Sequence, residues 1–521
     1  MNTTELMTIA GAIVPDRDFM IFEGNRSTYE DTTQRINQLS QFFSQLSAGE
    51  QPRVGIISVN CPQYIETYFA AAKNGAIFVP LNFRAKAEEL VYMINAAEIK
   101  VLVVGERYLD MMQEIIPQLT TVEHYLAIDG SADQFVSYEE SLAASPDEEM
   151  FLELDEDDTT ILMFTSGTTG RPKAVPLTHN SFTSYILENV DPADPEMEES
   201  NILTVPLYHI AGIQAILAAV YGGRTLILMK QFDAVEWLET VQKERANRAM
   251  LVPTMIKQLI DHEKFGDYDL SSLQIITYGA AVMPFEVIKK AIGLFPDAAF
   301  INAFGQTETG STIATLSPED HDISGTEEEQ RIKLKRLSSS IGKPLPDVEI
   351  QIIDELGKPV EANVVGEIVA RGPRIMGGYW KDEVKTAQAF TPDGWLRTSD
   401  LGWIDEDGYI YLSGRADDLI IRGGENISPR EIEEVLFGHP AVRDAAVFGI
   451  PSQEWGQEVM AVVVVNPDDP LSAEELIDFC KSKLSSFKSP SKLELVESLP
   501  RSALGKLSRK QLVQNYSKKD I

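Results

Sequence analysis

The sequence predicts an α/β protein with a large N-terminal domain, built from two helix-covered sheets plus a small β-rich subdomain, and a small α+β C-terminal domain. Three observations lead to this fold class. Strand-like and helix-like segments alternate in the first third of the chain, a second alternating run follows residue 200, and the composition changes again after Arg415. Alternation of this kind is typical of parallel sheets covered by helices. A chain of 521 residues is long enough for more than one core.

The first alternating run predicts one sheet, and the second run predicts another of the same type. The segments of the first run are 54–59 (strand), 63–73 (helix), 76–80 (strand), 86–97 (helix) and 101–104 (strand). A polar, acidic break at 145–158 leads into an apolar strand at 161–164. The segments of the second run are 202–205, 213–221, 225–228, 235–245, 248–252, 254–262, 273–277 and 284–292.

The remainder of the chain predicts the β-rich subdomain and a separate compact unit. Residues 317–340 are polar and charged, which indicates a solvated connection. Glycine-punctuated short strands between 341 and 412 indicate the subdomain. The unit that follows has a helix at 429–436, strands at 445–450 and 459–465, a helix at 473–484 and a helix after 508. The expected division of the chain is therefore 1–413, 414–418 and 419–521.

The composition is that of a globular protein with an unusually acidic surface. The chain is 44% hydrophobic and 24% charged, and its net charge is −35. Such a surface repels nucleic acid, and an anionic ligand needs local positive charge. Cys61 and Cys480 lie far apart and indicate neither a disulfide framework nor a metal cluster. The amino terminus lacks the basic segment of a signal peptide, and the apolar stretch 210–221 is shorter than the about 20 residues of a membrane span, so we expect a cytoplasmic protein without a transmembrane segment.

The segment 164–173, FTSGTTGRPK, is the strongest functional motif of the chain. Glycines let backbone N–H groups converge on an anion, and the hydroxyl groups and the lysine ammonium add donors. A surface turn is the alternative for this composition. A Walker loop is excluded because Pro172 and Ala174 stand where that motif needs glycine and Ser or Thr. The motif predicts a polyphosphate site made of Thr165, Ser166, Gly167, Thr168, Thr169, Gly170 and Lys173.

These ten residues match the pattern F/Y-T-S-G-S/T-T-G-x-P-K in full. The chain thereby resembles the adenylate-forming (AMP-binding) superfamily, closest in pattern to acyl- and aryl-CoA ligases such as 4-chlorobenzoate:CoA ligase. The resemblance runs from Thr28 to Lys506. It implies an enzyme that uses ATP, Mg²⁺ and CoA, in which a carboxylate attacks the α-phosphate to give acyl-AMP and pyrophosphate before CoA takes the acyl group. It also implies that residues 419–521 form a mobile lid that turns about a hinge at 414–418.

The resemblance places an acyl pocket beside His209, which follows a strand and Pro206. A histidine that caps the next helix or is hydrogen-bonded in the core is the alternative. The other expected pocket residues are Ile210, Ala211, Ile213, Tyr278, Gly305 and Ile313. Acetate-specific relatives have tryptophan at the position of Gly305, so glycine there implies room for an acyl group larger than acetyl. No Arg or Lys occurs in these segments, which disfavours a second carboxylate on the substrate.

Two strand ends are expected to hold the nucleotide. Small residues after Tyr278 let the adenine approach the backbone, although tight strand–helix packing also explains them. The expected contacts are Gly279, Ala280, Ala281, Asn302, Ala303, Phe304, Gly305, Gln306 and Thr307. Phe304 stands where the family usually has tyrosine, so its ring can stack but offers no phenol oxygen.

Glu308 is the expected Mg²⁺ ligand. A carboxylate beside a polyphosphate loop is repelled unless a cation lies between them, and carboxylate oxygen is a ligand that Mg²⁺ prefers. The resemblance implies that Thr307 donates to the α-phosphate and that the hydroxyl of Thr165 completes the metal shell. A solvated loop glutamate is the alternative.

Two further motifs match the family beyond residue 395. Asp400 is expected to accept hydrogen bonds from the ribose, with Ser399 in place of the usual glycine, and a turn aspartate is the alternative. The stretch 414–427 implies that Arg415 contacts the nucleotide and that Asp417 is the hinge. An ordinary hairpin with acidic turns is the alternative. The residues expected beside the pantetheine chain of CoA are Gly423, Gly424 and Glu425.

Lys506 matches the catalytic lysine of the family, whose ammonium bridges the substrate carboxylate and the α-phosphate. Only Gly505 and the resemblance distinguish it from the solvated lysines nearby. The residues expected at the CoA nucleotide are Trp455, Phe487 and Lys488, although core packing explains Trp455 equally well.

The sequence therefore predicts an ATP- and Mg²⁺-dependent acid–CoA ligase acting on a carboxylate larger than acetate, with catalytic residues Lys506, Thr307, Glu308 and His209. Medium-chain aliphatic, alicyclic and aromatic acids all fit an apolar pocket. The alternatives are a stand-alone adenylation enzyme that loads a carrier protein, a luciferase-like oxygenase and a non-catalytic nucleotide-binding scaffold. The expected partners are the small-molecule carboxylate, ATP and CoA, with no nucleic acid, and a homodimer is compatible with the sequence.

Overall fold

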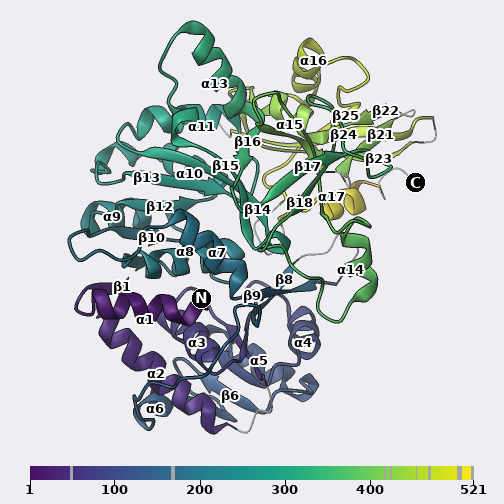
Figure 1. The fold of residues 1–521 in the computed structure, drawn as a ribbon. Coiled ribbons are helices and arrows are strands. Elements are labelled where there is room, and N and C mark those ends of the chain that lie inside the picture. The colour runs from purple at the N-terminus through teal and green to yellow at the C-terminus, as the bar shows by residue number, and fades with distance from the viewer. Residues whose placement is uncertain are drawn as a thin grey trace.

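The computed structural model describes residues 1–46, 51–165, 171–415, 418–422, 425–452, 454–466, 471–501 and 507–517. Within these residues the chain forms three sheets with helices packed on them, from the purple N-terminal layer to the yellow-green C-terminal unit (Figure 1). This is the mixed α/β class that the sequence predicts. No helix of the described residues is both long and apolar enough to cross a membrane.

A seven-stranded sheet forms the N-terminal layer, in the order β7-β6-β5-β3-β4-β8-β9. It is parallel except for its terminal hairpin, β8–β9. Its strands are β3 (Arg53–Ile57), β4 (Ile77–Pro80), β5 (Val101–Val104), β6 (His124–Ala127), β7 (Phe135–Ser137), β8 (Thr159–Thr165) and β9 (Lys173–Thr178). The helices between these strands are α3 (Pro62–Lys73), α4 (Ala87–Ala96), α5 (Leu109–Ile115) and α6 (Tyr138–Ala143). The predicted first alternating run is confirmed.

A thirteen-stranded sheet follows, in the order β17-β18-β19-β20-β16-β15-β14-β13-β12-β10-β11-β1-β2. Its mostly parallel half consists of β1 (Asp18–Phe22), β2 (Asn25–Thr28), β10 (Ser200–Leu203), β11 (Thr225–Leu228), β12 (Arg248–Leu251), β13 (Ile275–Gly279) and β14 (Ala299–Gln306). The helices of this half are α1 (Thr3–Ile13), α2 (Tyr29–Gln45), α7 (Asn180–Asn189), α8 (Ile210–Tyr221), α9 (Ala234–Glu244), α10 (Pro253–Ile260) and α11 (Phe285–Leu294). β1 pairs with β11 across about 200 residues of chain, which local alternation does not reveal.

The β-rich subdomain is the antiparallel half of this second sheet. It consists of β15 (Ser311–Leu316), β16 (Ser340–Pro344), β17 (Glu349–Ile353), β18 (Gly366–Arg371), β19 (Leu396–Ile404) and β20 (Ile410–Arg415), with helix α14 (Glu383–Ala389). β16 pairs with β15 on one side and with β20 on the other, so the subdomain is joined to the parallel half by backbone hydrogen bonds.

The polar segment 317–340 is mostly exposed or half-buried, as expected of a solvated connection, and it is helical. It forms α12 (Pro318–His321) and α13 (Glu327–Ser339). Each helix begins with a capping box, from Ser317 and from Thr326. Leu337 is the one buried residue of α13. The helix therefore has no apolar stripe of period 3.6, which is the pattern that would have predicted it.

The C-terminal unit has its own sheet and its own core. Strands β22 (Glu425–Ile427), β21 (Ile420–Arg422), β24 (Gly456–Val465) and β23 (Val442–Ser452) are neighbours in that order, and β25 (Lys492–Leu495) pairs with β24. The helices are α15 (Pro429–Phe437), α16 (Ala473–Lys483) and α17 (Arg509–Tyr516). Ile432 and Leu436 of α15 pack with Val447 and Val459 of the sheet. Within the described residues, side chains of this unit reach the larger part at two places: Ser428 Oγ donates to Ser413 O, and Arg430 Nη1 donates to Leu412 O at 3.1 Å.

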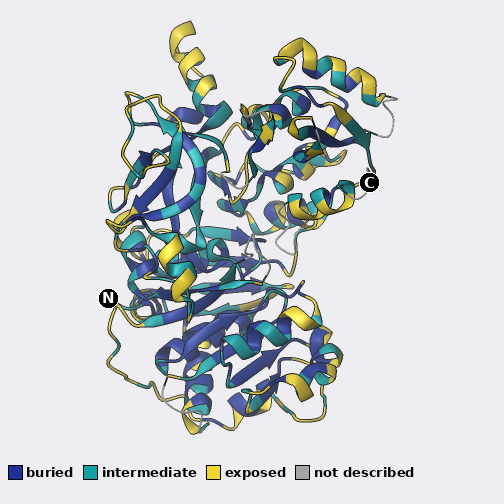
Figure 2. Cartoon of the chain, turned by 90° about the vertical axis from the view of Figure 1, so that its right-hand side faces the viewer, coloured by how far each residue is buried: buried dark blue, intermediate teal, exposed yellow. Residues whose placement is uncertain are grey.

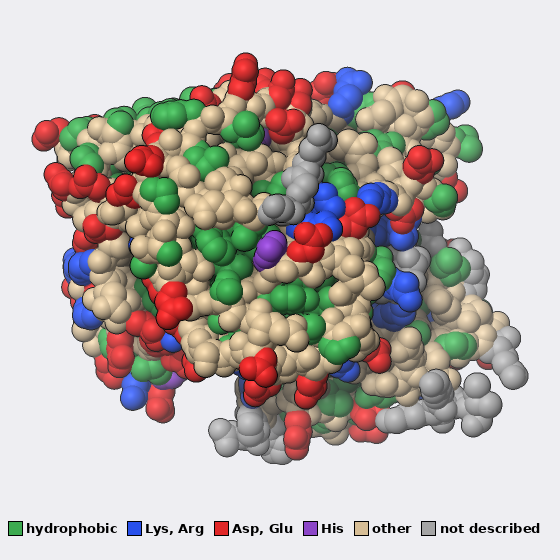
Figure 3. All heavy atoms as spheres, turned by 90° about the horizontal axis from the view of Figure 1, so that it is seen from below, with side chains coloured by type: hydrophobic (Ala, Val, Ile, Leu, Met, Phe, Trp, Pro, Cys, Tyr) green, Lys and Arg blue, Asp and Glu red, His purple; other side chains and the backbone are tan. Residues whose placement is uncertain are grey.

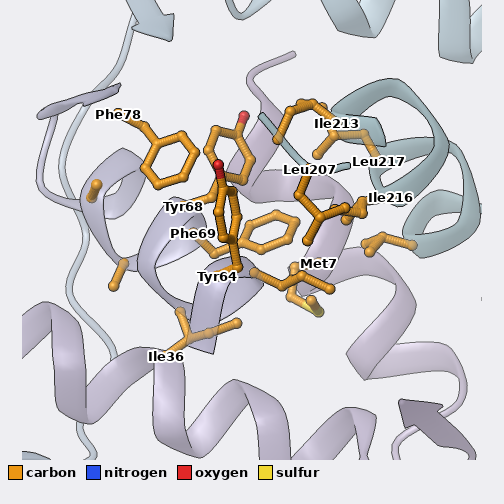
Figure 4. Packing of buried hydrophobic residues seen from close by; sticks show 14 of the residues in the cluster. Met7, Ile36, Tyr64, Tyr68, Phe69, Phe78, Leu207, Ile213, Ile216 and Leu217 are labelled. Carbon is orange, nitrogen blue, oxygen red and sulfur yellow. The ribbon is translucent and has the colours of Figure 1, made fainter. Parts of the chain in front are cut away.

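The largest core lies between the seven-stranded sheet and the thirteen-stranded sheet. Tyr64, Tyr68 and Phe69 of α3 pack near Leu207 and the α8 residues Ile213, Ile216 and Leu217 (Figure 4). Figure 2 shows the consequence, with buried strands inside and exposed residues on the outer faces of the helices. This core packs β8 of the seven-stranded sheet against β10 and β11 of the thirteen-stranded sheet, to which β14 also belongs.

Candidate functional site

The polyphosphate motif lies on the hairpin β8–β9. Thr165, the last residue of β8, pairs directly with Lys173, the first residue of β9. Tyr92 donates a hydrogen bond of 3.3 Å to the carbonyl of Pro172 and so supports the second leg of the loop. Five predicted phosphate contacts lie outside the described residues: Ser166, Gly167, Thr168, Thr169 and Gly170.

Glu308 lies against this hairpin, although it is 143 positions from Thr165 in sequence. It occupies the short 3₁₀ turn η4 (Thr307–Thr309) that follows β14. Thr165 Oγ1 donates to Glu308 Oε1 at 3.3 Å, and Met376 N donates to the Glu308 carbonyl at 3.0 Å. The structure therefore brings together the residues from which the sequence predicts a phosphate and metal site.

Tyr379 connects these residues and is absent from the sequence prediction. Its hydroxyl donates to Glu308 Oε1 at 3.1 Å, and its ring centroid lies 4.7 Å from Lys173 Nζ, within cation–π distance. Burial, and secondarily the Glu308 carboxylate, raise the phenol pKa far above its usual value, so the hydroxyl stays a donor. The preceding pair Gly377-Gly378, which lets the chain turn sharply, is the signal that could have drawn attention to it.

A hollow opens beside Tyr379. Its volume is about 560 Å³. Trp380 N donates to Ala174 O at 2.9 Å, which fixes one wall against β9. The lining residues are Pro176, Gly377, Gly378, Tyr379, Trp380, Lys381, Asp382, Glu383, Thr386 and Ala387. Lys173 and Glu308 do not line this hollow, which adjoins them through Tyr379.

The ends of β14 and β20 meet at Asp400, which lies in the middle of β19. Asp400 is 8% exposed, and its carboxylate accepts a hydrogen bond of 2.7 Å from Gln306 Nε2. Gln306 also donates to Thr398 O at 2.9 Å. Arg415 Nε lies 3.8 Å from the other carboxylate oxygen. The predicted nucleotide residues Gln306, Asp400 and Arg415 are thus in one group.

Ser399 has a φ of +59°, in the left-handed region that favours glycine. A glycine at this position would therefore have a backbone reason, and serine adopts this conformation at a conformational cost. The strained residue lies within β19, directly before Asp400, where the pairing of β19 with β18 is irregular.

The residues expected at the adenine end two neighbouring parallel strands. Gly279 pairs with Ala303, and a Cβ at Gly279 would lie 2.2 Å from the Ala303 carbonyl oxygen, so tight strand packing requires this glycine. Ala280 and Ala281 are exposed just beyond the strand. The half-buried residues of β14 and η4 are Asn302, Ala303, Phe304, Gly305, Gln306 and Thr307. Tight strand packing and a close approach of adenine therefore both fit these small residues.

Gly305 is required by the backbone of its own strand. A Cβ there would lie 1.9 Å from the Ser311 carbonyl oxygen, because the pairing of β14 with β15 shifts register between Phe304 and Gly305. The local backbone needs glycine whatever the substrate. The inference from Gly305 to a larger acyl group stays a prediction beside this backbone requirement.

Tyr278, a predicted pocket residue, lies in a hydrophobic core. Its side chain is 1% exposed, and its hydroxyl lies 2.8 Å from His321 Nε2 inside a hydrophobic core. Strand alternation turns it to the core face of β13. Ile213 and Ile313 are also core residues, at 1% and 0% exposure.

The remaining pocket candidates surround the start of α8. His209 is the N-cap residue, and its ring centroid lies 4.5 Å from that of Tyr208. Ile210 and Ala211 follow in the first turn and are half-buried. His209, Ile210 and Ala211 therefore stay accessible at the carboxyl edge of the sheet, where ligands of α/β proteins bind.

The predicted CoA residues on the C-terminal unit form an exposed group. Trp455 and Phe487 are 43% and 40% exposed, so neither is a core residue. Arg422 lies over the Trp455 ring at 5.7 Å and donates to the Phe487 carbonyl at 2.7 Å. Lys488 forms an ion pair with Glu431 at 2.7 Å. Glu425 is exposed on β22.

Four predicted site residues of this unit lie outside the described residues: Asp417, Gly423, Gly424 and Lys506.

The oxygen atoms around Glu308 suit Mg²⁺. In the described part of the chain, no group of three or more His, Cys, Asp and Glu residues could hold a metal alone. The Glu308 carboxylate accepts hydrogen bonds from the hydroxyl groups of Thr165 and Tyr379. Mg²⁺ is commonly held by one or two carboxylates together with phosphate oxygens and water.

Positive charge at the site opposes the acidic background. Asp and Glu side chains are spread over the face drawn in Figure 3, whereas Lys and Arg side chains gather in smaller groups. Lys173 and Arg415 supply local positive charge for an anion in a chain of net charge −35.

Comparison with known proteins agrees with this geometry. Family models match residues 10–380 (AMP-binding enzyme) and 431–506 (AMP-binding enzyme C-terminal domain). A putative acyl-CoA synthetase of Bacillus subtilis, YngI, is 31% identical over 96% of this chain and 94% of that protein. A feruloyl-CoA synthase of an Amycolatopsis species is 31% identical over 95% of this chain and 94% of that protein.

Two more similarities bear on the acceptor and on the fold. A fatty acid–acyl-carrier-protein ligase of Streptomyces coeruleorubidus, ScoC, is 30% identical over 96% of this chain and 94% of that protein. The crystal structure of ATP-bound MatB from Rhodopseudomonas palustris superposes with a TM-score of 0.87, at 26% identity over 100% of both chains.

Proposed function

The chain belongs to the AMP-binding enzyme family, and from this premise we propose that it is an ATP- and Mg²⁺-dependent acid–CoA ligase that acts on a carboxylate larger than acetate. The observation that carries the proposal is the meeting of Thr165, Lys173 and Glu308 around Tyr379. The substrate carboxylate and the polyphosphate of ATP are both anions and repel each other. A cation site, a lysine and a phosphate loop at one edge of a sheet would offset this repulsion.

The first half-reaction joins the carboxylate to AMP. Lys173 and the loop hold the polyphosphate, and Glu308 and Thr165 hold Mg²⁺, which neutralises phosphate charge when it is bound. The hydroxyl of Tyr379 keeps the Glu308 carboxylate in place. The carboxylate of the acid then attacks the α-phosphate, and pyrophosphate leaves. Lys506 contacts both reacting groups in this proposal.

Asp400 and Arg415 hold the rest of the nucleotide. Asp400 is preoriented by the 2.7 Å hydrogen bond from Gln306, which leaves its other oxygen facing Arg415 at 3.8 Å. Ribose hydroxyl groups can donate to this carboxylate. A group that is already fixed loses little entropy on binding, which favours tight nucleotide binding.

The second half-reaction transfers the acyl group to CoA. The C-terminal unit turns about Asp417, withdraws Lys506, and presents Gly423, Gly424 and Glu425 to the pantetheine chain. The exposed Trp455, the exposed Phe487 and the nearby cations Arg422 and Lys488 suit an adenine nucleotide, since rings stack on a base and cations attract its phosphates.

The acid is expected to be apolar. His209, Ile210 and Ala211 offer no cationic partner for a second carboxylate. An acyl group larger than acetyl is supported by the relative that is named as a feruloyl-CoA synthase, since Gly305 also has a backbone reason of its own. A carrier protein as acceptor is the second candidate, because ScoC is named for that reaction.

A panel assay tests the proposal. Pyrophosphate release is measured with acetate, octanoate, cyclohexanecarboxylate, benzoate, ferulate and malonate, each with CoA, with a phosphopantetheinylated carrier protein, and with neither. We expect CoA-dependent thioester from an apolar acid larger than acetate. Thioester formation on the carrier protein alone would favour the second candidate, and no carboxylate-dependent pyrophosphate release with any acid would contradict both.

A further inference from the structure

Arg374 is a fully buried cation that binds two segments beside the candidate site. Its side chain is 0% exposed, and its Nε and Nη2 donate to the two carboxylate oxygens of Asp347, the second at 2.9 Å. Its Nη1 donates to the Thr312 carbonyl at 2.6 Å. The guanidinium therefore joins the loop between β16 and β17 to the start of β15 by hydrogen bonds of fixed direction.

The segment that follows Arg374 contacts Glu308 directly. Met376 N donates to the Glu308 carbonyl at 3.0 Å, and the Tyr379 hydroxyl donates to the Glu308 carboxylate at 3.1 Å. The bond from Arg374 to Thr312 lies four residues further along the same stretch. Hydrogen bonds from residues 374–379 thus hold the stretch 308–312 at both of its ends.

The stretch 308–312 has a backbone that needs such support. Gly310 and Ser311 have φ values of +61° and +89°, and a left-handed conformation is costly for serine. A Cβ at Gly310 would lie 2.5 Å from the Arg374 carbonyl oxygen, so the two main chains are in direct contact. Strained backbone persists only where the surrounding contacts determine it. The place of Glu308, two residues before Gly310, therefore depends on the contacts of residues 374–379.

The charges of Arg374 and Asp347 suit positioning better than stability. Both groups lose hydration when they are buried, and apolar side chains of similar volume are often no less stabilising than a buried ion pair. A guanidinium that donates to a carboxylate and to a carbonyl has one orientation, whereas an apolar side chain imposes none. Direction is therefore what this pair supplies.

We propose that Arg374, held by Asp347, is a positioning residue that keeps the Glu308 carboxylate where it can bind Mg²⁺. Arg374 fixes the β15 end of the turn through Thr312, and the main chain that follows it holds Glu308 itself. Arg374 touches neither the metal nor a substrate. The proposal rests on the proposed function, because it takes Glu308 to be the Mg²⁺ ligand of the adenylation step.

The test measures ATP–pyrophosphate exchange by the full-length enzyme over a range of Mg²⁺ concentrations, with the panel acid that gives the highest rate. The variant Asp347→Leu/Arg374→Met removes both charges at once, so no buried charge is left unpaired and the urea midpoint should stay close to that of the unaltered enzyme. The Mg²⁺ concentration for half-maximal exchange should rise about tenfold, the lower end of the range for groups that orient metal ligands. Arg374→Lys keeps the charge but loses the fork, so the rise should be about threefold.

A matched control separates positioning from a general loss of stability. Arg224 is 12% exposed and forms an ion pair of 2.7 Å with Glu199. These residues directly precede β11 and β10, so they lie at the opposite edge of the sheet from the candidate site. Arg224→Met should lower the urea midpoint and leave the Mg²⁺ requirement within about twofold, because distant sites act independently.

A double substitution tests whether Arg374 acts through Glu308. When Asp347→Leu/Arg374→Met is combined with Glu308→Gln, it should raise the Mg²⁺ requirement of Glu308→Gln by less than about twofold, since the effects of residues that act as a unit do not add. A role that is only structural would give the same rise whether residue 308 is Glu or Gln.

The outcomes distinguish the two proposals. A higher Mg²⁺ requirement in Asp347→Leu/Arg374→Met, absent from Arg224→Met and from the Glu308→Gln background, supports the positioning role. If that variant does not fold, Arg374→Lys decides, since a raised requirement supports the role and an unchanged one overturns it. An equal rise with and without Glu308 also overturns it. Absence of carboxylate-dependent exchange in the unaltered enzyme would contradict the proposed function, and the positioning role with it.

Discussion

Removal of a single oxygen atom from Tyr379 tests the geometry around Glu308. Tyr379→Phe keeps the ring over Lys173, 4.7 Å from its ammonium, and removes only the hydroxyl that donates to Glu308 at 3.1 Å. A hydrogen bond to a charged group contributes about 1.5–3 kcal/mol. Because Tyr379 is only half-buried, we take the lower end of this range, and about 1.4 kcal/mol corresponds to a factor of about ten in rate or affinity.

The assay for Tyr379→Phe is ATP–pyrophosphate exchange over a range of Mg²⁺ concentrations. We expect the Mg²⁺ concentration for half-maximal exchange to rise, or the maximal exchange rate to fall, by about tenfold, with thioester formation from acyl-AMP unchanged. Tyr138→Phe is the matched control, since the Tyr138 hydroxyl donates to the carboxylate of Glu66 at 2.9 Å in the N-terminal layer. Exchange within a factor of two of the unaltered enzyme at every Mg²⁺ concentration would refute the role of the Tyr379 hydroxyl.

Four other predictions address the strained and buried residues and the metal. Ser399→Gly should raise the free energy of unfolding by about 0.5 kcal/mol, because relief of a left-handed serine exceeds the entropic cost of glycine; a lower urea midpoint would contradict this. Gly305→Ala should lower it by about 2–3 kcal/mol, since its Cβ would overlap the Ser311 carbonyl; a loss under about 0.5 kcal/mol in the same assay would show that the backbone does not need glycine there. Burial lowers the pKa of His321 to about 4, against about 6.5 in the unfolded chain. The unfolded state therefore binds the extra proton, so stability is complete above pH 6.5 and falls by up to about 3 kcal/mol as the pH drops towards 4; a His321→Gln variant whose urea midpoint falls as steeply over this range would contradict the assignment. Chelation of Mg²⁺ with EDTA should abolish exchange and spare thioester formation from acyl-AMP, and exchange that persists in EDTA would exclude the metal role of Glu308.

The alternation of strands and helices was predictable because each parallel strand is bounded by turns and followed by a helix that covers it. Segments 54–59 and 101–104 match β3 and β5 for this reason. The pairing of β1 with β11 was not predictable, because contacts over such a separation leave no local pattern. The charged helix α13 was missed because its sequence has no apolar stripe to detect.

Some residues of the candidate site could likewise be predicted from the sequence, and others could not. Thr165, Lys173 and Glu308 could be assigned from chemistry and motif, and the structure places them together. Tyr379 could not be assigned, because a tyrosine that follows two glycines is as typical of an ordinary turn as of a binding site. The reason for Gly305 is a carbonyl oxygen of the next strand, and a close backbone approach has no sequence signature beyond the glycine itself.

ATP–pyrophosphate exchange by the unaltered enzyme and by Glu308→Gln is the most direct test of the central claim, that Thr165, Lys173 and Glu308 form one site for Mg-ATP and a carboxylate. The claim predicts exchange that depends on both the acid and Mg²⁺, and at least about a 10²-fold loss in Glu308→Gln, as for other charge-stabilising groups. Exchange that needs no carboxylate, or that Glu308→Gln leaves unchanged, would contradict it.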